Sequence, residues 1–143
     1  MKGKILALDF GLKRTGVAMT DDLCMIASPL DTIDSSRLNG FLSAIVLKEK
    51  IHTIVIGEPK RLDGSDSHVT QNVYLLKEAL EKQFPDLTIC LYDERFTSKM
   101  ASMAIISGGL KKEKRKDKGL IDKVSAAILL QSYLEHLSTT KKS

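Results

Sequence analysis

The chain has 143 residues, a length that fits one domain and leaves little room for a second. Its composition, 43% hydrophobic and 28% charged, is typical of a soluble globular protein. The apolar runs are much shorter than the ~20 residues that span a bilayer, and the N-terminus has no signal-peptide pattern. We therefore expect one cytoplasmic domain over residues 1–137, without a membrane partner, and a disordered tail over residues 138–143.

The cysteines and histidines indicate no metal or catalytic site of their own. Cys24 and Cys90 lie far apart in apolar surroundings, which favours two buried thiols in a reducing compartment. No Cys and His spacing is typical of zinc. The histidines at 52, 68 and 136 are scattered, and we assign them no catalytic role.

The positive charge is concentrated near the C-terminus. Residues 1–110 contain 13 Lys and Arg against 14 Asp and Glu, whereas residues 111–143 contain 9 against 4. Most of the excess lies in the stretch 111–118 (KKEKRKDK). Such a cluster attracts phosphate backbones, but it is equally consistent with a solvated loop.

Apolar periodicity and turn residues predict the secondary structure in chain order. Strands are expected at 5–9, 15–20, 26–33, 52–56 and 87–92, and helices at 36–50, 69–84 and 120–137. A short helix is expected to begin at Thr97 or Ser98 and to end at the glycines 108–109. Ser35 or Ser36 is expected to cap the first helix, and Pro29 indicates an edge or a bend in the third strand.

This order of elements predicts an α/β fold. The three leading strands suggest an antiparallel meander, because a turn at 12–14 makes the first two a hairpin. The later strands, separated by helices, are expected to add in parallel through right-handed crossovers. The result is a mixed five-stranded sheet with helices on both faces.

Three acidic residues stand at the ends of predicted elements. Asp9 ends the first strand, Glu94 follows the fifth, and Asp122 begins the last helix. Ligands of open α/β sheets gather at the carboxyl ends of the strands, and converging carboxylates favour a hard divalent cation. Two such ions would suit phosphodiester cleavage. Because side chains alternate along a strand, only one of Asp93 and Glu94 can face Asp9, and spacing does not decide which.

Each acid also has a purely structural interpretation. Asp9 could open a turn, Asp122 could stabilise a helix N-terminus, and residues 93–95 could form a surface ion-pair cluster. The three together, with a basic stretch nearby in the sequence, favour the functional interpretation.

At this point the sequence resembles the YqgF/RuvX family. Four segments in order carry the resemblance: residues 9–18 (DFGLKRTGVA), 56–59 (IGEP) with 63–65 (DGS), 92–98 (YDERFTS), and 121–127 (IDKVSAA) through 130–131 (LQ). They extend over almost the whole chain. The first alone would be unspecific, since sugar kinases and actin-like ATPases share a similar Asp-x-Gly hairpin.

The resemblance implies a ribonuclease H-like fold and a metal-dependent endonuclease. Members are described both as pre-16S rRNA processing enzymes and as Holliday junction resolvases. By the family pattern, Asp9, Glu94 and Asp122 would be the catalytic metal ligands, holding Mg²⁺ or Mn²⁺, with two ions when substrate is bound.

Several basic residues would contact the nucleic acid. Arg14 and Arg95 would lie close to the site and hold a phosphate oxygen. Lys60 and Arg61, after the fourth strand, could follow the backbone. Lys114 and Arg115, in the basic stretch, complete the set of expected substrate contacts.

Three further residues qualify the comparison with the family. Thr97 could cap the following helix or touch substrate, and capping is favoured. Glu58 stands where the family usually has an apolar residue, which adds a fourth acid near the site. Ser67 stands where a Gly is common. The last two departures affect the substrate loop rather than the metal ligands.

Two other classes of protein compete with a nuclease. An ATP-dependent phosphotransferase would need a second domain to close over its nucleotide, and 143 residues leave no room for it. A nucleic-acid-binding factor without turnover would share the fold and the salt-dependent affinity. The sequence does not choose between structured RNA, such as precursor rRNA, and branched DNA, nor between a monomer and a homodimer.

Overall fold

The computed structural model describes residues 3–59, 69–97 and 118–141. Its strands are β1 (Lys4–Phe10), β2 (Arg14–Thr20), β3 (Ala27–Asp34), β4 (Ile51–Glu58) and β5 (Thr88–Asp93). Its helices are α1 (Leu38–Glu49), α2 (Thr70–Gln83) and α4 (Lys118–Lys141), with 3-10 turns η1 (Ser35–Arg37) and η2 (Glu94–Phe96). Within these ranges no helix is long and apolar enough to cross a membrane.

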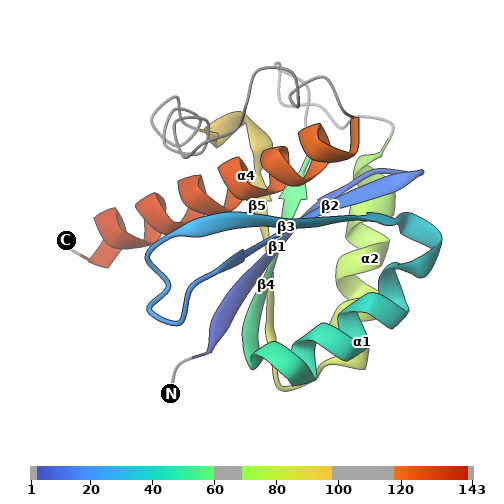
Figure 1. Cartoon of the computed structure of the whole chain (residues 1–143), viewed down its shortest axis with the longest axis horizontal. Helices are drawn as coiled ribbons and strands as arrows, with labels where there is room; N and C mark the ends of the chain where they lie inside the picture. Colours follow the sequence, from blue (N-terminus) through green and yellow to red (C-terminus); the bar gives the residue numbers. More distant parts are fainter. Residues whose placement is uncertain (1–2, 60–68, 98–117, 142–143) are drawn as a thin grey trace.

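The strands form one mixed sheet in the order β3-β2-β1-β4-β5. β2 pairs antiparallel with both β1 and β3, while β4 pairs parallel with both β1 and β5. Figure 1 shows α4 lying across one face of the sheet and α1 and α2 covering the other. The predicted mixed five-stranded α/β fold is therefore confirmed.

The alternation of side chains along β1 divides the core into two layers. Leu6 and Leu8 pack in the layer with α1 and α2, whereas Ile5 and Ala7 pack in the layer with α4. All four are buried, as expected for a strand covered on both faces. The next position on the α4 face is Asp9, so the same alternation that builds the core directs this carboxylate toward α4.

The third strand is an edge strand with an irregular register, as Pro29 predicted. Val17 of β2 pairs with Asp31, but the following Ala18 pairs with Pro29, so Leu30 is an extra residue on β3. Proline has no N–H to donate and is tolerated at such a bulge on an edge strand.

Two local predictions were wrong. The helix before β4 begins with η1, and neither η1 nor α1 has a side-chain cap. The Ser35 hydroxyl instead donates to the Gly11 carbonyl of the β1–β2 hairpin, at 2.6 Å. The last helix also continues to Lys141, so the segment predicted as a disordered tail is helical over residues 138–141. The short helix predicted up to residue 108 lies outside the described residues.

The close approach of α4 to the sheet depends on Gly16 of β2. A Cβ atom at this position would overlap the Asp122 carbonyl oxygen, whereas a Cβ at Gly40 in α1 would meet nothing within 4 Å. We expect Gly16→Ala to lower the free energy of unfolding by about 3 kcal/mol, because a helix backbone must move to admit the methyl group.

The matched control is Gly40→Ala on the exposed side of α1. It should stabilise the protein by roughly 0.5–1 kcal/mol, since alanine is the better helix former. Urea unfolding of both variants measures the difference, and equal effects would contradict the proposed contact with α4.

Candidate functional site

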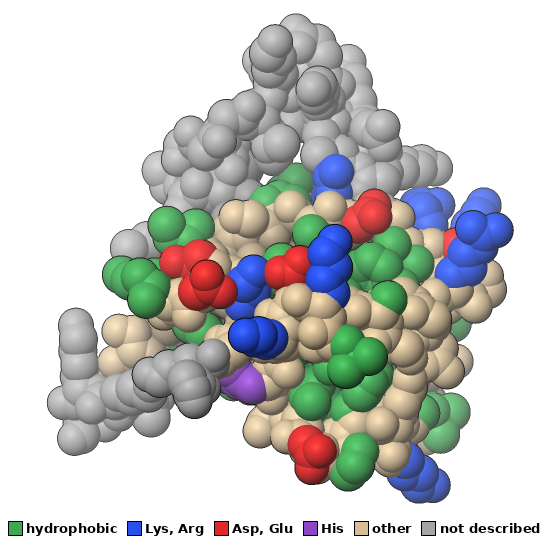
Figure 2. Space-filling model, turned by 60° about the horizontal axis from the view of Figure 1, so that its bottom comes forward, with side chains coloured by type: hydrophobic (Ala, Val, Ile, Leu, Met, Phe, Trp, Pro, Cys, Tyr) green, Lys and Arg blue, Asp and Glu red, His purple; other side chains and the backbone are tan. Residues whose placement is uncertain are grey.

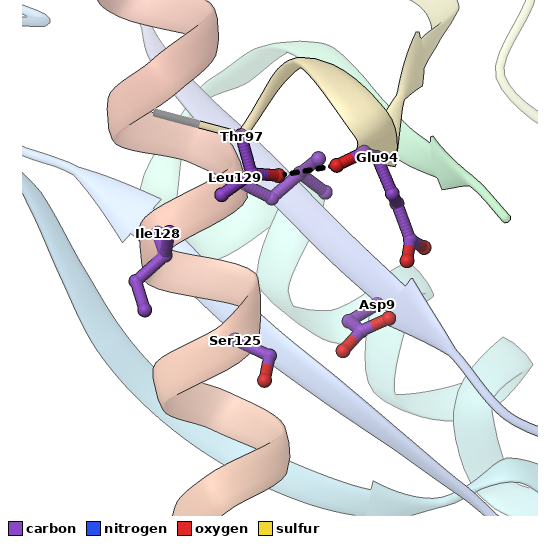
Figure 3. A pocket seen from close by; sticks show the side chains of 6 residues that line it. All are labelled: Asp9, Glu94, Thr97, Ser125, Ile128 and Leu129. Atoms are coloured by element: carbon purple, nitrogen blue, oxygen red, sulfur yellow. Dashed lines mark hydrogen bonds between the residues drawn. The ribbon is translucent and has the colours of Figure 1, made fainter. Parts of the chain in front are cut away.

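Asp9 and Glu94 meet at the carboxyl edge of the sheet. Asp9 lies near the end of β1, and Glu94 begins η2 directly after β5. Figure 3 shows the two carboxyl groups facing each other beside α4. β1 and β5 are not neighbours, because β4 lies between them, so the Glu94 side chain must cross the end of β4 to reach Asp9.

Gly57 of β4 leaves the space that Glu94 occupies. A Cβ atom on Gly57 would lie 2.6 Å from Oε2 of Glu94 and 3.1 Å from Cδ2 of Leu129. Any side chain here would compete with the carboxylate for the same volume. In the sequence Gly57 follows the fourth predicted strand and belongs to the segment 56–59 that carries the family resemblance, but its role at the site was not predicted.

Gly16 plays the corresponding part on the other side of Asp9. It is the direct partner of Asp9 in the β1–β2 register, and the Asp122 backbone of α4 lies against it. Asp9 is thus flanked by a glycine on each neighbouring strand. One glycine admits the side chain of Glu94 and the other admits the backbone that bears Asp122.

Burial and neighbouring negative charge weaken the acidity of this pair. Burial raises the pKa of Asp9 to about 7, and the charges of Glu94 and Asp122 and a hydrogen bond with Glu94 contribute in the same direction. Burial also raises the pKa of Glu94, although the hydrogen bond with Asp9 opposes that shift. Both carboxyl groups therefore hold a proton to higher pH than a free carboxyl group does.

The third predicted ligand, Asp122, is engaged elsewhere. Nε of Arg14 donates to Oδ2 of Asp122 at 2.8 Å. In the described part of the chain, no three His, Cys, Asp or Glu side chains converge closely enough to hold a metal ion. Two of the three predicted ligands are brought together, and the third is held beside them by an arginine.

A pocket of about 230 Å³ opens beside the carboxylate pair. Asp9 and Glu94 form one side, and α4 supplies Ser125, Ile128 and Leu129 (Figure 3). Its remaining side is Thr97, whose hydroxyl donates to the Glu94 carbonyl oxygen at 2.8 Å. Thr97 thus closes η2 and steadies Glu94, and its predicted capping of a following helix concerns residues outside the described ranges.

The neighbouring Asp93 turns away from this pocket. Its carboxylate accepts hydrogen bonds from Nε and Nη2 of Arg95, at 3.1 and 2.6 Å, and from the Arg95 backbone N–H. Of the two adjacent acids, Glu94 therefore faces Asp9. Arg95 was expected to contact a phosphate, and in the structure its guanidinium is hydrogen-bonded to Asp93.

The other predicted substrate contacts are only partly within the described residues. Lys60, Arg61, Lys114 and Arg115 lie outside them. Glu58, the additional acid, accepts a hydrogen bond from the Tyr74 hydroxyl at 2.5 Å. On the face drawn in Figure 2, Lys and Arg side chains are interleaved with Asp and Glu. Residues 111–117 of the basic stretch lie outside the described ranges, so the role of that stretch stays a prediction.

The donor set fits a hard divalent cation. Two carboxyl groups with raised pKa values face each other in a partly buried pocket, and a divalent cation bound between them would neutralise both. Carboxylate oxygens are ligands that Mg²⁺ and Mn²⁺ prefer. Asp9 and Glu94 could hold such an ion, and Asp122 lies close enough for its charge to act on Asp9.

The fold is shared with two solved proteins whose descriptions refer to Holliday junctions. RuvC of Thermus thermophilus, solved in complex with a Holliday junction substrate, matches with a TM-score of 0.61 at 11% identity, over 95% of this chain and 97% of that one. The yeast mitochondrial Holliday junction resolvase Ydc2 matches with a TM-score of 0.61 at 11% identity, over 99% and 81%. The chain thus has a ribonuclease H-like fold with an acidic pair at the carboxyl edge of its sheet.

Sequence comparisons define the family more narrowly. The family model described as "RuvX: Holliday junction resolvase" matches residues 3–136. A protein of Christiangramia forsetii is 48% identical over 92% of this chain and 97% of its own length, and one of Phocaeicola vulgatus is 45% identical over 92% and 95%. Both carry the name "Putative pre-16S rRNA nuclease". The chain belongs to the RuvX family.

The raised pKa of Asp9 predicts a pH-dependent effect of Asp9→Asn on stability when divalent ions are removed by a chelator. The pKa rises from an ordinary 3.8 to about 7 on folding, so stability is lost as the pH rises from about 4 to about 7 and stays low above. Asparagine does not ionise and escapes this loss. We expect a gain on the order of 2 kcal/mol near pH 8 and almost none near pH 4, measured by thermal unfolding.

The control for this prediction is Asp86→Asn, an exposed aspartate in the turn before β5. It should leave stability almost unchanged at both pH values. A gain for Asp9→Asn that does not vary with pH would contradict the electrostatic explanation.

Proposed function

We propose that this protein is a metal-dependent endonuclease that hydrolyses phosphodiester bonds, with precursor 16S rRNA as its substrate and the cytoplasm as its location. The observation that carries the proposal is the pair of facing carboxyl groups, Asp9 and Glu94, in an open pocket at the carboxyl edge of the sheet. Two facing, partly buried carboxyl groups destabilise the folded state electrostatically, so their arrangement does not serve the stability of the core.

Asp9, Glu94 and Asp122 are the proposed ligands of the cation, Mg²⁺ or Mn²⁺, with two ions when substrate is bound. Bound ions of this kind activate a water molecule and stabilise the leaving oxygen of a phosphodiester. The chain itself orients the carboxylates: Thr97 steadies Glu94, and the β1–β2 register fixes Asp9. Arg14, at the first position of β2, is the residue that we propose to hold a phosphate oxygen.

The RNA substrate is proposed on the names of relatives that are more than 40% identical over nearly their whole length. A Holliday junction is the second candidate, favoured by the description of the family model. The two candidates differ in symmetry, since a junction resolvase makes paired cuts and favours a homodimer. Trimming of precursor rRNA can be carried out by a monomer, which is the oligomeric state we propose.

The direct test compares cleavage of precursor 16S rRNA and of a synthetic four-way DNA junction. We expect the wild type to cut the rRNA with Mg²⁺ or Mn²⁺ and not with a chelator. Asp9→Asn and Glu94→Gln should each lower the rate by about a hundredfold or more, because each removes a charge on which the metal site depends.

Asp86→Asn and Glu78→Gln are the matched controls, since both make the same chemical change at exposed positions, and both should retain wild-type rates. Undiminished cleavage by either site variant would exclude a nuclease centred on these acids. Metal-independent binding of rRNA without cleavage would instead support a binding factor, and preferential cutting of the junction would support a resolvase.

Gly57→Ala provides a subtler test of the same site. The added methyl group would lie 2.6 Å from the Glu94 carboxylate and 3.1 Å from Leu129. Both neighbours are ends of flexible side chains, so we expect a stability loss of only about 1 kcal/mol. Displacement of Glu94 from Asp9 should nevertheless lower metal-dependent cleavage by about tenfold or more.

Gly40→Ala is the control for this substitution, because its methyl group meets nothing within 4 Å. Wild-type cleavage by a folded Gly57→Ala variant would show that the position of Glu94 is unimportant.

A further inference from the structure

The ion pair of Arg14 and Asp122 lies at the edge of the proposed metal site. Asp9 and Glu94 already face each other, but Asp122 is bound by Nε of Arg14 at 2.8 Å. We infer that Arg14 withholds Asp122 from the cation until a phosphate of the nucleic acid takes the guanidinium, so that the metal site is completed only when substrate binds. The inference rests on the proposed function.

The backbone positions of both partners are fixed by the fold. Arg14 is the first residue of β2, two residues before Gly16, and Asp122 lies near the start of α4. The Asp122 carbonyl oxygen is packed against Gly16, which pairs with Asp9. The ligand change that we infer is a rotation of the Asp122 side chain on this backbone position.

The ion pair is accessible and leaves part of the arginine available. The side chains are 37% and 27% exposed for Arg14 and Asp122, so solutes reach both. Among the described residues, Nε is the only atom of the Arg14 guanidinium with a hydrogen-bond partner. The terminal nitrogens can thus bind a phosphate oxygen before the hydrogen bond to Asp122 breaks, so Arg14 need not lose one partner before it gains the other.

In the exchange, Arg14 and Asp122 each replace one oppositely charged partner with another. A guanidinium binds phosphate as readily as carboxylate. When Arg14 pairs with phosphate, the released Asp122 carboxylate gains a cation as its partner beside Asp9 and Glu94. Without substrate, the ion pair compensates the negative charge of Asp122 beside the two facing carboxyl groups of Asp9 and Glu94.

The exchange makes the binding of cation and nucleic acid interdependent. If phosphate frees Asp122 for the cation, substrate must tighten cation binding, and by linkage the cation must tighten substrate binding by the same factor. An arginine that only positioned Asp122 would add nothing to the coupling that direct contact between the cation and the phosphate produces. The part of the coupling that is lost when Arg14 is replaced therefore distinguishes the two roles.

The test measures Mn²⁺ affinity by electron paramagnetic resonance, in the absence of nucleic acid, for the full chain and its variants. We expect Arg14→Gln to bind Mn²⁺ about fivefold or more tightly than the wild type, because Asp122 is released. Arg37→Gln removes the same charge from the exposed turn η1 and should leave the affinity unchanged. In an Asp122→Asn background, Arg14→Gln should have no further effect, since its partner is gone.

A second measurement uses the wild type and so does not depend on the folding of a variant. Affinity for a fluorescein-labelled RNA stem-loop is followed by anisotropy with Ca²⁺ or with a chelator, and a gel confirms that the RNA stays intact. Ca²⁺ should tighten binding by about fivefold or more in the wild type, and by a smaller factor in Arg14→Gln.

The outcomes separate this inference from the function on which it rests. Equal or weaker Mn²⁺ binding by Arg14→Gln, or no Ca²⁺ effect on wild-type RNA affinity, would overturn the exchange while leaving the nuclease in place. If the wild type binds no Mn²⁺, or binds it no better than Asp9→Asn does, both the metal site and the exchange are overturned.

Discussion

The structure depends on placing acidic groups around Asp9 in a site from which much of the water is excluded. Burial is the main reason why the pKa of Asp9 is raised, and repulsion by the charges of Glu94 and Asp122, which is strong in a low-dielectric setting, adds to it. The fold tolerates it because the surrounding sheet is covered by apolar side chains on both faces. Stability is supplied by the core, which leaves the carboxyl edge available for an unfavourable arrangement.

Space is the second constraint, and glycine meets it on both sides of Asp9. Gly57 gives up its side-chain volume to the Glu94 carboxylate, and Gly16 gives up its volume to the α4 backbone. The buried alanines where α4 crosses the sheet, Ala7, Ala18 and Ala126, continue the same small-residue surface. The closeness of α4 to β1 and β2 is thus a property of the sheet surface as well as of the helix.

Much of the fold could be predicted because its signals are local. Apolar runs and alternation gave the strands, Pro29 marked the irregular edge, and intervening helices indicated the parallel additions. Asp9 and Glu94 were found for the same reason, since residues at the ends of strands can be identified along the chain. The contact of the Ser35 hydroxyl with Gly11 was not found, because a hairpin 24 residues away competes with the helix N-terminus for that hydroxyl.

The remaining features of the site depend on distances across the sheet, which a one-dimensional pattern does not contain. The sequence places Gly57 after a strand, but only the structure shows that the Glu94 side chain lies over it. The choice between Asp93 and Glu94 is decided by Arg95, whose hydrogen bonds direct Asp93 out of the pocket.

The ion pair of Arg14 and Asp122 joins residues 108 positions apart, and it changes the meaning of the three acids. In the sequence they form a set of equal ligands. In the structure two of them face each other in a partly buried pocket, and the third has a cationic partner. A cation bound by the pair would neutralise it, and a phosphate would replace Asp122 as the partner of Arg14. The arrangement therefore responds to the two ligands that a phosphodiester-cleaving site must bind.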